Sequence, residues 1–299
     1  LIRLATEHNT SLIPRTAGTS LAGQCVGEGI VVDVSKYFTR IIELNETNKT
    51  VRVQPGVIRD ELNAYLKPYG LFFGPNTSTS NRCMIGGMVG NNSSGTTSIK
   101  YGVTRDKIIA LTTLLSDGSE VVFSEISSEK AKEKAALNTL EGSIYKTLFS
   151  ELSSEEVRQE IRDQFPKSEI HRRNTGYAVD ALLDAEVFGG DSDLNLCKLL
   201  AGSEGTLALT TEITLKLDDL PPKYETMVVA HYNSIESCLN DVNEIMTHDL
   251  YACEMIDDTI LNCTKSNMKY EPYRFFVKDD PKCLLLLELR DNSEAGLSD

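Results

Sequence analysis

The sequence predicts an α+β protein of two domains, with a first domain over residues 1–220 and a partial second domain over residues 221–299. Three observations lead to this prediction. Apolar runs with a period of two alternate with segments of helical spacing along the 299 residues. Pro221 and Pro222 interrupt the chain between two such stretches. After these prolines, a strand–helix–strand order is typical of the opening of a ferredoxin-like α+β domain.

The first domain is predicted to contain many short strands. Alternating apolar residues and flanking turn residues predict strands at residues 11–14, 30–34, 40–44, 50–53, 108–115, 120–123 and 207–217. The dipeptide Asp117-Gly118 joins two of them and is a strong hairpin signal. Apolar residues at helical spacing predict one amphipathic helix over residues 57–69, which ends at Gly70.

Two further regions complete the predicted elements. Residues 127–164 are helical in pattern and highly charged, which indicates a solvated insertion, and SSEE at residues 153–156 has the spacing of a capping box. In the second domain, the pattern predicts strands and helices in alternation. The strands are expected at residues 225–232, 250–256 and 283–289, and the first helix at residues 235–246.

The charge of the chain argues against two classes of partner. Lys and Arg number 30 and Asp and Glu number 44, which gives a net charge of −14. Such an acidic chain is a poor match for nucleic acid or for an anionic membrane surface. Because no apolar run reaches about 18 residues, we expect a soluble protein with no transmembrane segment.

The cysteines indicate a reducing compartment. There are seven of them, scattered along the sequence with no C-x-x-C pair. This spacing suits neither a disulfide framework nor a zinc or iron–sulfur site, so we expect reduced thiols, no metal and a cytoplasmic protein. Leu1 already lies within a helical pattern and Ser298-Asp299 follow no closing signal, so we also expect a fragment of a longer chain.

Residues 74–102 form a glycine-rich run that could bind a ligand. It contains six glycines among Asn, Ser and Thr, with no acidic side chain. Glycine lets the backbone approach a ligand closely, and the neutral polar side chains supply hydrogen-bond donors and acceptors. An electron-rich planar or phosphorylated ligand could therefore lie along this run. A plain loop is the alternative interpretation, because clusters of Gly, Asn and Ser are common in turns.

Residues 15–24 form a second loop of this kind. Arg15 offers a permanent positive fork, Gly18 and Gly23 free the backbone, and neighbouring Thr and Ser add hydroxyl groups. This combination suits a pyrophosphate, although the loop matches neither the G-x-G-x-x-G nor the P-loop pattern. A glycine-bearing turn with a solvated arginine is the alternative.

Two later segments are also polar. GSEGTL at residues 202–207 is a glycine-flanked turn that leads into the long strand of residues 207–217. HRRNTGY at residues 171–177 is a basic island in an acidic chain. It could meet an anionic substrate or the edge of a cofactor, but a solvated surface loop is the favoured interpretation.

Taken in order, three motifs resemble the FAD-binding domain of the vanillyl-alcohol oxidase and p-cresol methylhydroxylase superfamily. The motifs are PRTAGTS at residues 14–20, MIGGMVGNNSSG at residues 84–95 followed by KYG at residues 100–102, and GSEGTL at residues 202–207. They are most similar to the branch of FAD-linked D-2-hydroxy-acid dehydrogenases. That branch includes D-lactate dehydrogenase, the glycolate oxidase flavin subunit and D-2-hydroxyglutarate dehydrogenase.

The resemblance implies a fold and a set of cofactor contacts. It implies an FAD-binding domain of two subdomains, about residues 1–55 and 56–220, followed by the start of a ferredoxin-like substrate (cap) domain. Residues 15–24 would surround the pyrophosphate, and the segments 75–79, 84–95 and 204–209 would lie along the flavin and ribityl chain. The implied cofactor-binding residues are Arg15, Thr16, Ala17, Gly18, Thr19, Ser20, Gly23, Gln24, Pro75, Asn76, Thr77, Thr79, Met84, Gly86, Gly87, Asn91, Asn92, Ser94, Gly95, Tyr101, Gly102, Glu204, Gly205 and Leu209.

The sequence departs from the family pattern at informative positions. Members with covalently attached flavin commonly have histidine where this chain has Thr19, which implies non-covalent FAD. Thr16 and Ala208 stand where glycine is usual, and backbone contacts tolerate both. The family's later G-H-x-x-D-G-N-x-H pattern has no match, so no catalytic residue is assigned.

The resemblance implies oxidation of a small D-2-hydroxy acid such as D-lactate, glycolate or 2-hydroxyglutarate, with hydride transfer to flavin N5. An iron–sulfur or quinone-linked electron acceptor would lie outside this chain. Two alternatives remain open. One is a sugar or alditol oxidase of the same superfamily, and the other is a non-catalytic fragment that binds flavin or serves as an interaction scaffold.

Overall fold

The structure is a computed structural model that describes residues 1–167, 169–170, 172–174 and 176–297. The chain divides into two compact units. The first unit comprises Leu1–Gly95 and Gly102–Asp219, and the second comprises Thr96–Tyr101 and the chain from Leu220 onward. Both units contain helices and strands, which confirms the predicted α+β class. The segment Thr96–Tyr101 therefore packs with the second unit, although it lies within the first domain in sequence.

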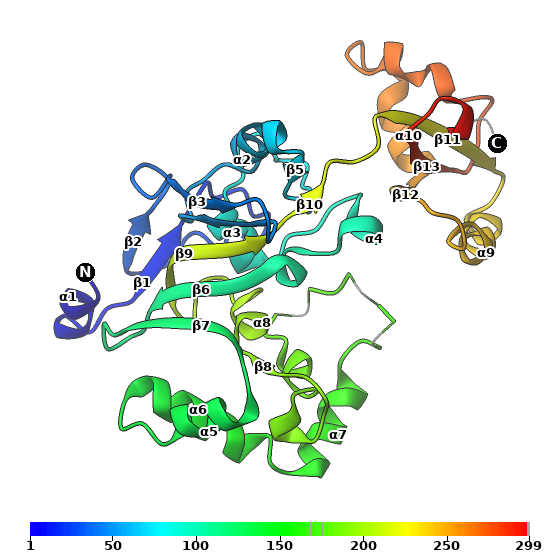
Figure 1. The fold of residues 1–299 in the computed structure, drawn as a ribbon. Coiled ribbons are helices and arrows are strands. Elements are labelled where there is room, and N and C mark those ends of the chain that lie inside the picture. The colour runs from blue at the N-terminus through cyan, green and yellow to red at the C-terminus, as the bar shows by residue number, and fades with distance from the viewer. Residues whose placement is uncertain (168, 171, 175, 298–299) are drawn as a thin grey trace. The chain divides into compact units, whose positions relative to one another are not determined.

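The first unit is built on a six-stranded sheet with the order β3-β4-β9-β6-β7-β8 (Figure 1). All neighbouring strands in it are antiparallel, and the predicted hairpin β6–β7 is present, as is a second hairpin, β3–β4. Ile213 and Leu215 in the central strand β9 are fully buried, because alternate residues of a strand share one face. The strands are β3 (Ile41–Asn45), β4 (Thr50–Val53), β6 (Ile108–Leu114), β7 (Glu120–Ile126), β8 (Leu194–Asn195) and β9 (Leu209–Lys216).

Two smaller sheets complete the strands of this unit. β1 (Leu12–Arg15) and β2 (Ile30–Asp33) pair in parallel, so residues 16–29 must return along their length to join them. β5 (Leu71–Phe72) and β10 (Asp218–Asp219) pair antiparallel. The predicted division of this unit into subdomains near residue 55 stays a prediction, and the main sheet contains strands from both sides of that position.

Helices pack against the sheet through apolar faces. In α2 (Arg59–Leu66), Leu62 and Leu66 are fully buried, and a 3₁₀ turn continues the chain to Gly70. Gly70 has φ 71°, a left-handed conformation that favours glycine at a helix end, as the sequence predicts. The first unit also contains α1 (Ile2–Glu7) and α8 (Cys197–Leu200).

The glycine-rich run contains a helix that the sequence pattern did not predict. α3 (Ile85–Asn91) includes three glycines, and glycine is an unfavourable residue inside a helix. Close packing explains their presence, because a Cβ on Gly86 would lie 2.4 Å from Cβ of Pro55 and one on Gly87 would lie 2.5 Å from Oγ1 of Thr16. Tertiary packing therefore outweighs helix propensity here.

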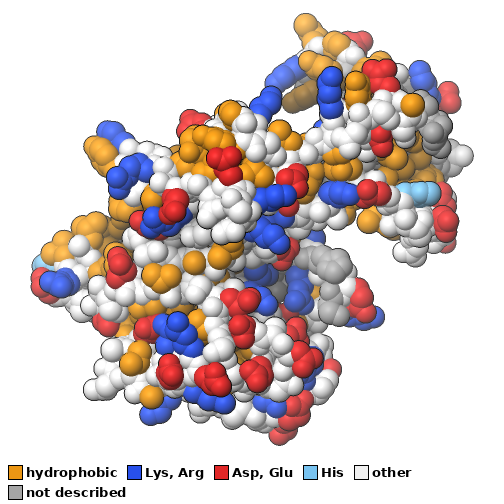
Figure 2. All heavy atoms as spheres, in the orientation of Figure 1, with side chains coloured by type: hydrophobic (Ala, Val, Ile, Leu, Met, Phe, Trp, Pro, Cys, Tyr) orange, Lys and Arg blue, Asp and Glu red, His pale blue; other side chains and the backbone are white. Residues whose placement is uncertain are grey.

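The charged region after β7 forms three helices: α5 (Ser128–Ala135), α6 (Leu140–Glu151) and α7 (Glu155–Gln164). Figure 2 shows acidic and basic side chains interspersed over this region. Ser154 is the N-cap of α7, but its side chain makes no capping hydrogen bond, so the predicted capping box does not form. Instead Nη1 of Arg158 donates to the carbonyl oxygen of Leu152 at 2.6 Å, and its guanidinium also pairs with Glu155.

The second unit contains a three-stranded antiparallel sheet with the order β11-β13-β12. Its core includes Cys238, Cys283 and Leu285, and the helix α9 contributes the first of these. The predicted strand–helix–strand order is confirmed. The elements are α4 (Ser98–Tyr101), β11 (Tyr224–Tyr232), α9 (Ile235–Ile245), β12 (Ala252–Asp257), α10 (Asp258–Lys265) and β13 (Cys283–Asp291). Among the described residues, no helix has both the length and the apolarity needed to span a membrane.

Candidate functional site

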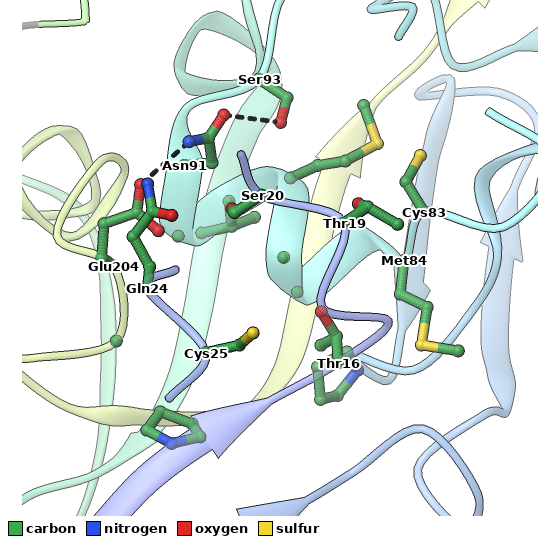
Figure 3. Close-up of a pocket in the computed structure, with 18 of the residues that line it drawn as sticks. Thr16, Thr19, Ser20, Gln24, Cys25, Cys83, Met84, Asn91, Ser93 and Glu204 are labelled. Atoms are coloured by element: carbon green, nitrogen blue, oxygen red, sulfur yellow. Dashed lines mark hydrogen bonds between the residues drawn. The ribbon is translucent and has the colours of Figure 1, made fainter. Parts of the chain in front are cut away.

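A cavity of about 480 Å³ opens in the first unit, and the three sequence motifs meet at its walls (Figure 3). Its volume lies within the range of about 300–1,000 Å³ that is usual for cofactor and ligand sites. The predicted residues that line it are Arg15, Thr16, Gly18, Thr19, Ser20, Gln24, Thr77, Thr79, Met84, Gly86, Gly87, Asn91, Ser94, Glu204, Gly205 and Leu209. Segments almost 200 residues apart in sequence thus converge on one space.

Other predicted residues do not line this cavity and stay predictions as cofactor contacts: Ala17, Gly23, Pro75, Asn76, Asn92, Gly95, Tyr101 and Gly102. Several have structural roles nearby. A Cβ on Gly95 would lie 2.2 Å from the carbonyl oxygen of Asn76, so glycine allows these two backbones to meet. Tyr101 packs edge-on against Tyr251 of the second unit, with ring centroids 6.0 Å apart.

The loop after β1 forms one wall. Gly18 and Gly23 have φ of 65° and 74°, so the loop turns at positions that favour glycine. Nε and Nη2 of Arg15 each lie 3.1 Å from the position that a Cβ on Gly18 would occupy. Sγ of Cys25 lies 3.3 Å from the same point. The guanidinium of Arg15 therefore folds over its own loop, beside the Cys25 thiol.

Helix α3 and the turn at residues 202–205 form the opposite part of the wall and are bonded to each other. The backbone N–H of Gly202 donates to the Val89 carbonyl oxygen at 3.0 Å, and that of Glu204 donates to the Gly90 carbonyl oxygen at 2.8 Å. Nδ2 of Asn91 donates to Oε1 of Glu204 at 2.9 Å. These three bonds fix where the Glu204 carboxylate lies in the cavity.

Arg105 stabilises this turn through hydrogen bonds to backbone carbonyl groups that precede it. Its Nε donates to the Lys198 carbonyl oxygen at 2.9 Å and its Nη2 to the Ala201 carbonyl oxygen at 2.7 Å. Its backbone N–H donates to Oδ1 of Asn92 at 2.8 Å. Burial lowers the pKa of the Arg105 guanidinium from its usual value. The sequence pattern did not indicate this residue, because its partners are backbone carbonyls more than 90 residues away.

The segment at residues 172–174 also reaches the cavity, while Arg172 and Asn174 are exposed, in agreement with the predicted surface loop; His171 and Thr175 of that loop lie outside the described residues. Arg172 and Asn174 both line it. Nε of Arg172 donates to Oγ of Ser94 at 3.0 Å. The neighbouring Arg173 instead pairs with Asp180, with Nη2 and Oδ2 2.5 Å apart. A basic cluster alone could not reveal this, since the contact with Ser94 spans 78 residues of sequence.

The cavity differs in charge from the rest of the chain. Its described lining residues include two cations, Arg15 and Arg172, and one anion, Glu204. The others are neutral, many with hydroxyl, thiol or amide groups. In a chain of net charge −14, this wall therefore favours an anionic ligand that also needs neutral hydrogen-bond partners.

One polar atom of the wall lacks a partner within the described part of the chain. Oε1 of Gln24 is buried and accepts no hydrogen bond. Leaving a buried acceptor unsatisfied costs about 1–3 kcal/mol. A ligand that donates a hydrogen bond in this cavity would remove that cost. As for metals, the described residues contain no group of three His, Cys, Asp or Glu side chains that could hold an ion.

Comparison with known families and proteins places these features in context. The family described as the FAD binding domain matches residues 1–124, and the family described as FAD linked oxidases, C-terminal domain, matches residues 221–298. The D-2-hydroxyglutarate dehydrogenase of Escherichia coli K12 is 36% identical over 279 residues, which cover 93% of this chain. The chain spans only 26% of that protein's length.

More distant relatives and a solved structure also match. The glycolate oxidase subunit GlcD of Bacillus subtilis is 28% identical, with 82% of this chain and 40% of that protein covered. The mitochondrial D-lactate dehydrogenase [cytochrome] 1 of Saccharomyces cerevisiae is 26% identical, with 87% and 35% covered. An alkyldihydroxyacetonephosphate synthase structure matches with a TM-score of 0.60 at 18% identity, covering 97% of this chain and 44% of that one. At this identity, the structural match shows the fold alone.

Proposed function

We propose that the full-length protein is an FAD-dependent dehydrogenase of a small D-2-hydroxy acid. The premise is that this chain belongs to the FAD-linked oxidases, whose FAD binding and C-terminal domains it matches. The observation that carries this proposal is the convergence of the three motifs on one cavity. The names of the relatives support the substrate class, since they act on 2-hydroxyglutarate, glycolate and D-lactate.

The cavity's own residues fit FAD in charge and in shape. Arg15 and the hydroxyls of Thr19 and Ser20 would hold the pyrophosphate, because a guanidinium and neutral donors together suit such an anion. Gly205, with φ 73° and no room for a Cβ beside Pro14, keeps the wall free of side chains. The unsatisfied Oε1 of Gln24 would accept a hydrogen bond from the cofactor.

When bound, FAD supplies a two-electron acceptor for the hydride that leaves the hydroxyl-bearing carbon. The chain's residues bind and orient it, and they add neutral donors along the cavity. The described lining residues include neither histidine nor lysine. We therefore propose that the base which takes the hydroxyl proton belongs to another part of the full-length protein.

Three further features belong to this proposal. FAD is held non-covalently, because Thr19 offers no nucleophilic ring nitrogen at the position where attachment is common in the family. The electron acceptor, an iron–sulfur or quinone-linked partner, lies outside this chain. We also place the protein in the cytoplasm, which is supported by seven cysteines that are all free thiols.

FAD titration tests the cofactor assignment. We expect the chain to bind FAD at micromolar concentration, with a perturbed flavin absorbance, and to release it into the supernatant on acid precipitation. Arg15→Met should weaken binding by about tenfold or more, because a charge-assisted contact is lost. Arg162→Met is the matched control, since Arg162 is exposed on α7 and pairs with Glu155. A chain that binds no flavin would remove the proposal.

The substrate class needs the full-length protein. Under anaerobic conditions, we expect D-2-hydroxyglutarate, D-lactate or glycolate to bleach the bound flavin, whereas L-2-hydroxyglutarate and L-lactate leave it oxidised. Bleaching by an alditol and by none of these acids would favour the sugar or alditol oxidase instead.

A further inference from the structure

The first turn of helix α2 holds one end of a loop that lines the cavity. The helix has no side-chain hydrogen bond at its N-cap, so the N–H groups of its first turn need other partners. The backbone N–H of Arg59 donates to the Cys83 carbonyl oxygen at 3.0 Å. That of Asp60 donates to the Ser80 carbonyl oxygen at 3.3 Å, and Oγ of Ser80 donates to Oδ2 of Asp60 at 3.0 Å. The C-terminal end of the loop at residues 73–83 is therefore fixed to α2.

The side chain of Arg59 holds the other end of this loop. Its Nε donates to the Pro75 carbonyl oxygen at 3.2 Å, and its Nη2 donates to the Phe73 carbonyl oxygen at 3.3 Å. Its Nη1 pairs with Oδ1 of Asp60 at 3.1 Å, and only 13% of the Arg59 side chain is exposed. Because the guanidinium is a rigid planar fork, these bonds fix the spacing of the two carbonyl groups.

These two carbonyl groups depend on side-chain donors. Phe73 and Pro75 are buried, and neither lies in a strand or helix that would supply a backbone partner. A second donor, Nδ2 of Asn63, reaches the Phe73 carbonyl oxygen at 3.2 Å. For the Pro75 carbonyl oxygen, Arg59 is the donor found within the described part of the chain. Since buried backbone acceptors are paired in nearly all native structures, loss of the guanidinium should shift this part of the loop.

The loop carries three polar groups of the cavity wall. Thr77, Thr79 and Cys83 line the cavity, whereas Arg59 is not among its described lining residues. Oγ1 of Thr77 lies 3.3 Å from Oγ1 of Thr79 and 3.2 Å from Sγ of Cys83, so the three groups form one hydrogen-bonded chain. Figure 3 shows Cys83 and Glu204 on opposite sides of the drawn site. The loop therefore meets a ligand on the side away from Glu204.

We propose that Arg59 is a positioning residue that raises the affinity for FAD without lining its cavity. It sets the backbone of residues 75–79, and that backbone places the Thr77 and Thr79 hydroxyls at the cavity wall. This inference rests on the proposed function and adds to it a residue outside the cavity on which cofactor affinity depends. A hydroxyl that is held in place before binding costs less entropy to order when FAD arrives. Lysine could replace only part of this role, because an ammonium lacks the planar fork that joins two carbonyl groups.

FAD titration of variants tests the proposal. The single variants are Arg59→Met, Arg59→Lys and Thr77→Val, and Arg162→Met is the control of charge. We expect Arg59→Met to weaken FAD binding by about tenfold, because hydrogen bonds from a charged group to the loop are lost. Arg59→Lys should recover part of that loss. Arg162→Met should bind FAD as wild type does, since Arg162 is exposed on α7 and pairs with Glu155.

A double variant separates positioning from general destabilisation. In the wild-type background, Thr77→Val should weaken FAD binding by about threefold to tenfold, because one hydroxyl is lost. In the Arg59→Met background, the same change should cost less than about twofold, since the displaced loop no longer presents this hydroxyl. Arg15 lies on another wall, so Arg15→Met should cost the same in both backgrounds within about twofold. If Arg59 merely stabilised the fold, the effect of Thr77→Val would be undiminished.

Other results would overturn the proposal. If Arg59→Met binds FAD as tightly as wild type, or if Thr77→Val costs as much in both backgrounds, Arg59 does not act through this loop. If Arg59→Met does not fold, as judged by its urea unfolding curve, Arg59→Lys takes its place in the double variant and the same criteria apply. These results leave the FAD assignment intact, because wild type still binds the cofactor. A wild-type chain that binds no FAD would instead remove the proposed function itself.

Discussion

Nδ2 of Asn91 lies 2.9 Å from Oε1 of Glu204, and this hydrogen bond joins residues 113 positions apart in sequence. It connects the end of α3 with the turn that precedes β9. Glu204 has φ 53°, a left-handed conformation that is uncommon for a residue with a side chain. The bond to Asn91 and the backbone bond to Gly90 hold it there. Two of the three motifs are thus fixed to each other as one wall of the cavity.

Replacing Asn91 with aspartate tests this connection. Asn91→Asp keeps the shape of the side chain but places a second carboxylate beside Glu204. Like charges at this distance repel, so we expect the affinity for FAD to fall by about tenfold at pH 8. FAD titration at pH 8 measures the effect.

Asn138→Asp is the control for this prediction. Asn138 is exposed in the first unit, so its replacement adds the same charge away from the cavity. It should leave the FAD affinity unchanged at pH 8. An equal effect of the two substitutions would mean that net charge, and not the contact with Glu204, decides the affinity.

The sequence predicts the local elements of this fold better than it predicts their contacts. The hairpin β6–β7 follows from Asp117-Gly118 between two alternating runs, which is local information. By contrast, the sequence pattern does not predict α3. Its glycines are needed because Pro55 and Thr16, which are distant in sequence, pack closely against them. The cavity loops could be predicted as ligand-binding segments from their residue types, since glycine and hydroxyl residues together indicate close approach of a ligand.

Residues that depend on tertiary position were harder to assign. Arg172 lies in a basic cluster whose composition predicts a solvated surface loop. Only its hydrogen bond to Ser94, which is seen in the structure, shows that it lines the cavity. The KYG motif predicts Tyr101 as a cofactor contact, and this stays a prediction; in the structure its ring packs against Tyr251 within the second unit. In both cases the deciding partner lies more than 70 residues away, where neither spacing nor composition carries information.

Two glycines of α3 should respond oppositely to substitution by alanine. A Cβ on Gly86 would lie 2.4 Å from Cβ and 3.0 Å from Cα of Pro55, so the backbone must shift. Gly86→Ala should lower the free energy of unfolding by about 1–3 kcal/mol, as overpacking does. On Gly90, the nearest atom is Cα of Glu204 at 3.6 Å, an ordinary contact. Gly90→Ala should therefore be neutral or stabilising by up to about 1 kcal/mol. Urea unfolding of the FAD-free variants checks both, and equal destabilisation would contradict the packing argument.

Two ion pairs of equal length should differ in their contribution to stability. Lys107–Asp218 and Lys49–Asp219 both have Nζ–Oδ distances of 2.6 Å. The side chains of the first pair are 10% and 20% exposed, and those of the second are 46% and 71% exposed. Lys107→Met leaves a largely buried carboxylate without its partner, so we expect a loss of about 2–4 kcal/mol in the free energy of unfolding.

Lys49→Met serves as the matched comparison. A surface pair contributes about 0–1 kcal/mol, so this variant should unfold at nearly the wild-type urea concentration. High salt should abolish the small loss in the free energy of unfolding caused by Lys49→Met. It should leave most of the loss caused by Lys107→Met, since buried pairs are screened less. Equal losses in the two variants would show that burial does not decide their strength.

The buried thiol of Cys197 should be unreactive in the folded chain. Its Sγ donates to the Phe123 carbonyl oxygen at 3.2 Å, and burial raises the pKa of the thiol to about 12 from 9.0. Since the thiolate is the reactive form, iodoacetamide at pH 8.5 should label the exposed Cys263 within minutes and label Cys197 only in urea, as peptide mass spectrometry can show.

The same pKa shift makes stability depend on pH, because the unfolded Cys197 thiol ionises near pH 9 and the folded one does not. The resulting stability is therefore complete below pH 9 and falls as the pH rises toward 12. Cys197→Ala should flatten that alkaline decline, and rapid labelling of Cys197 without urea would contradict its burial.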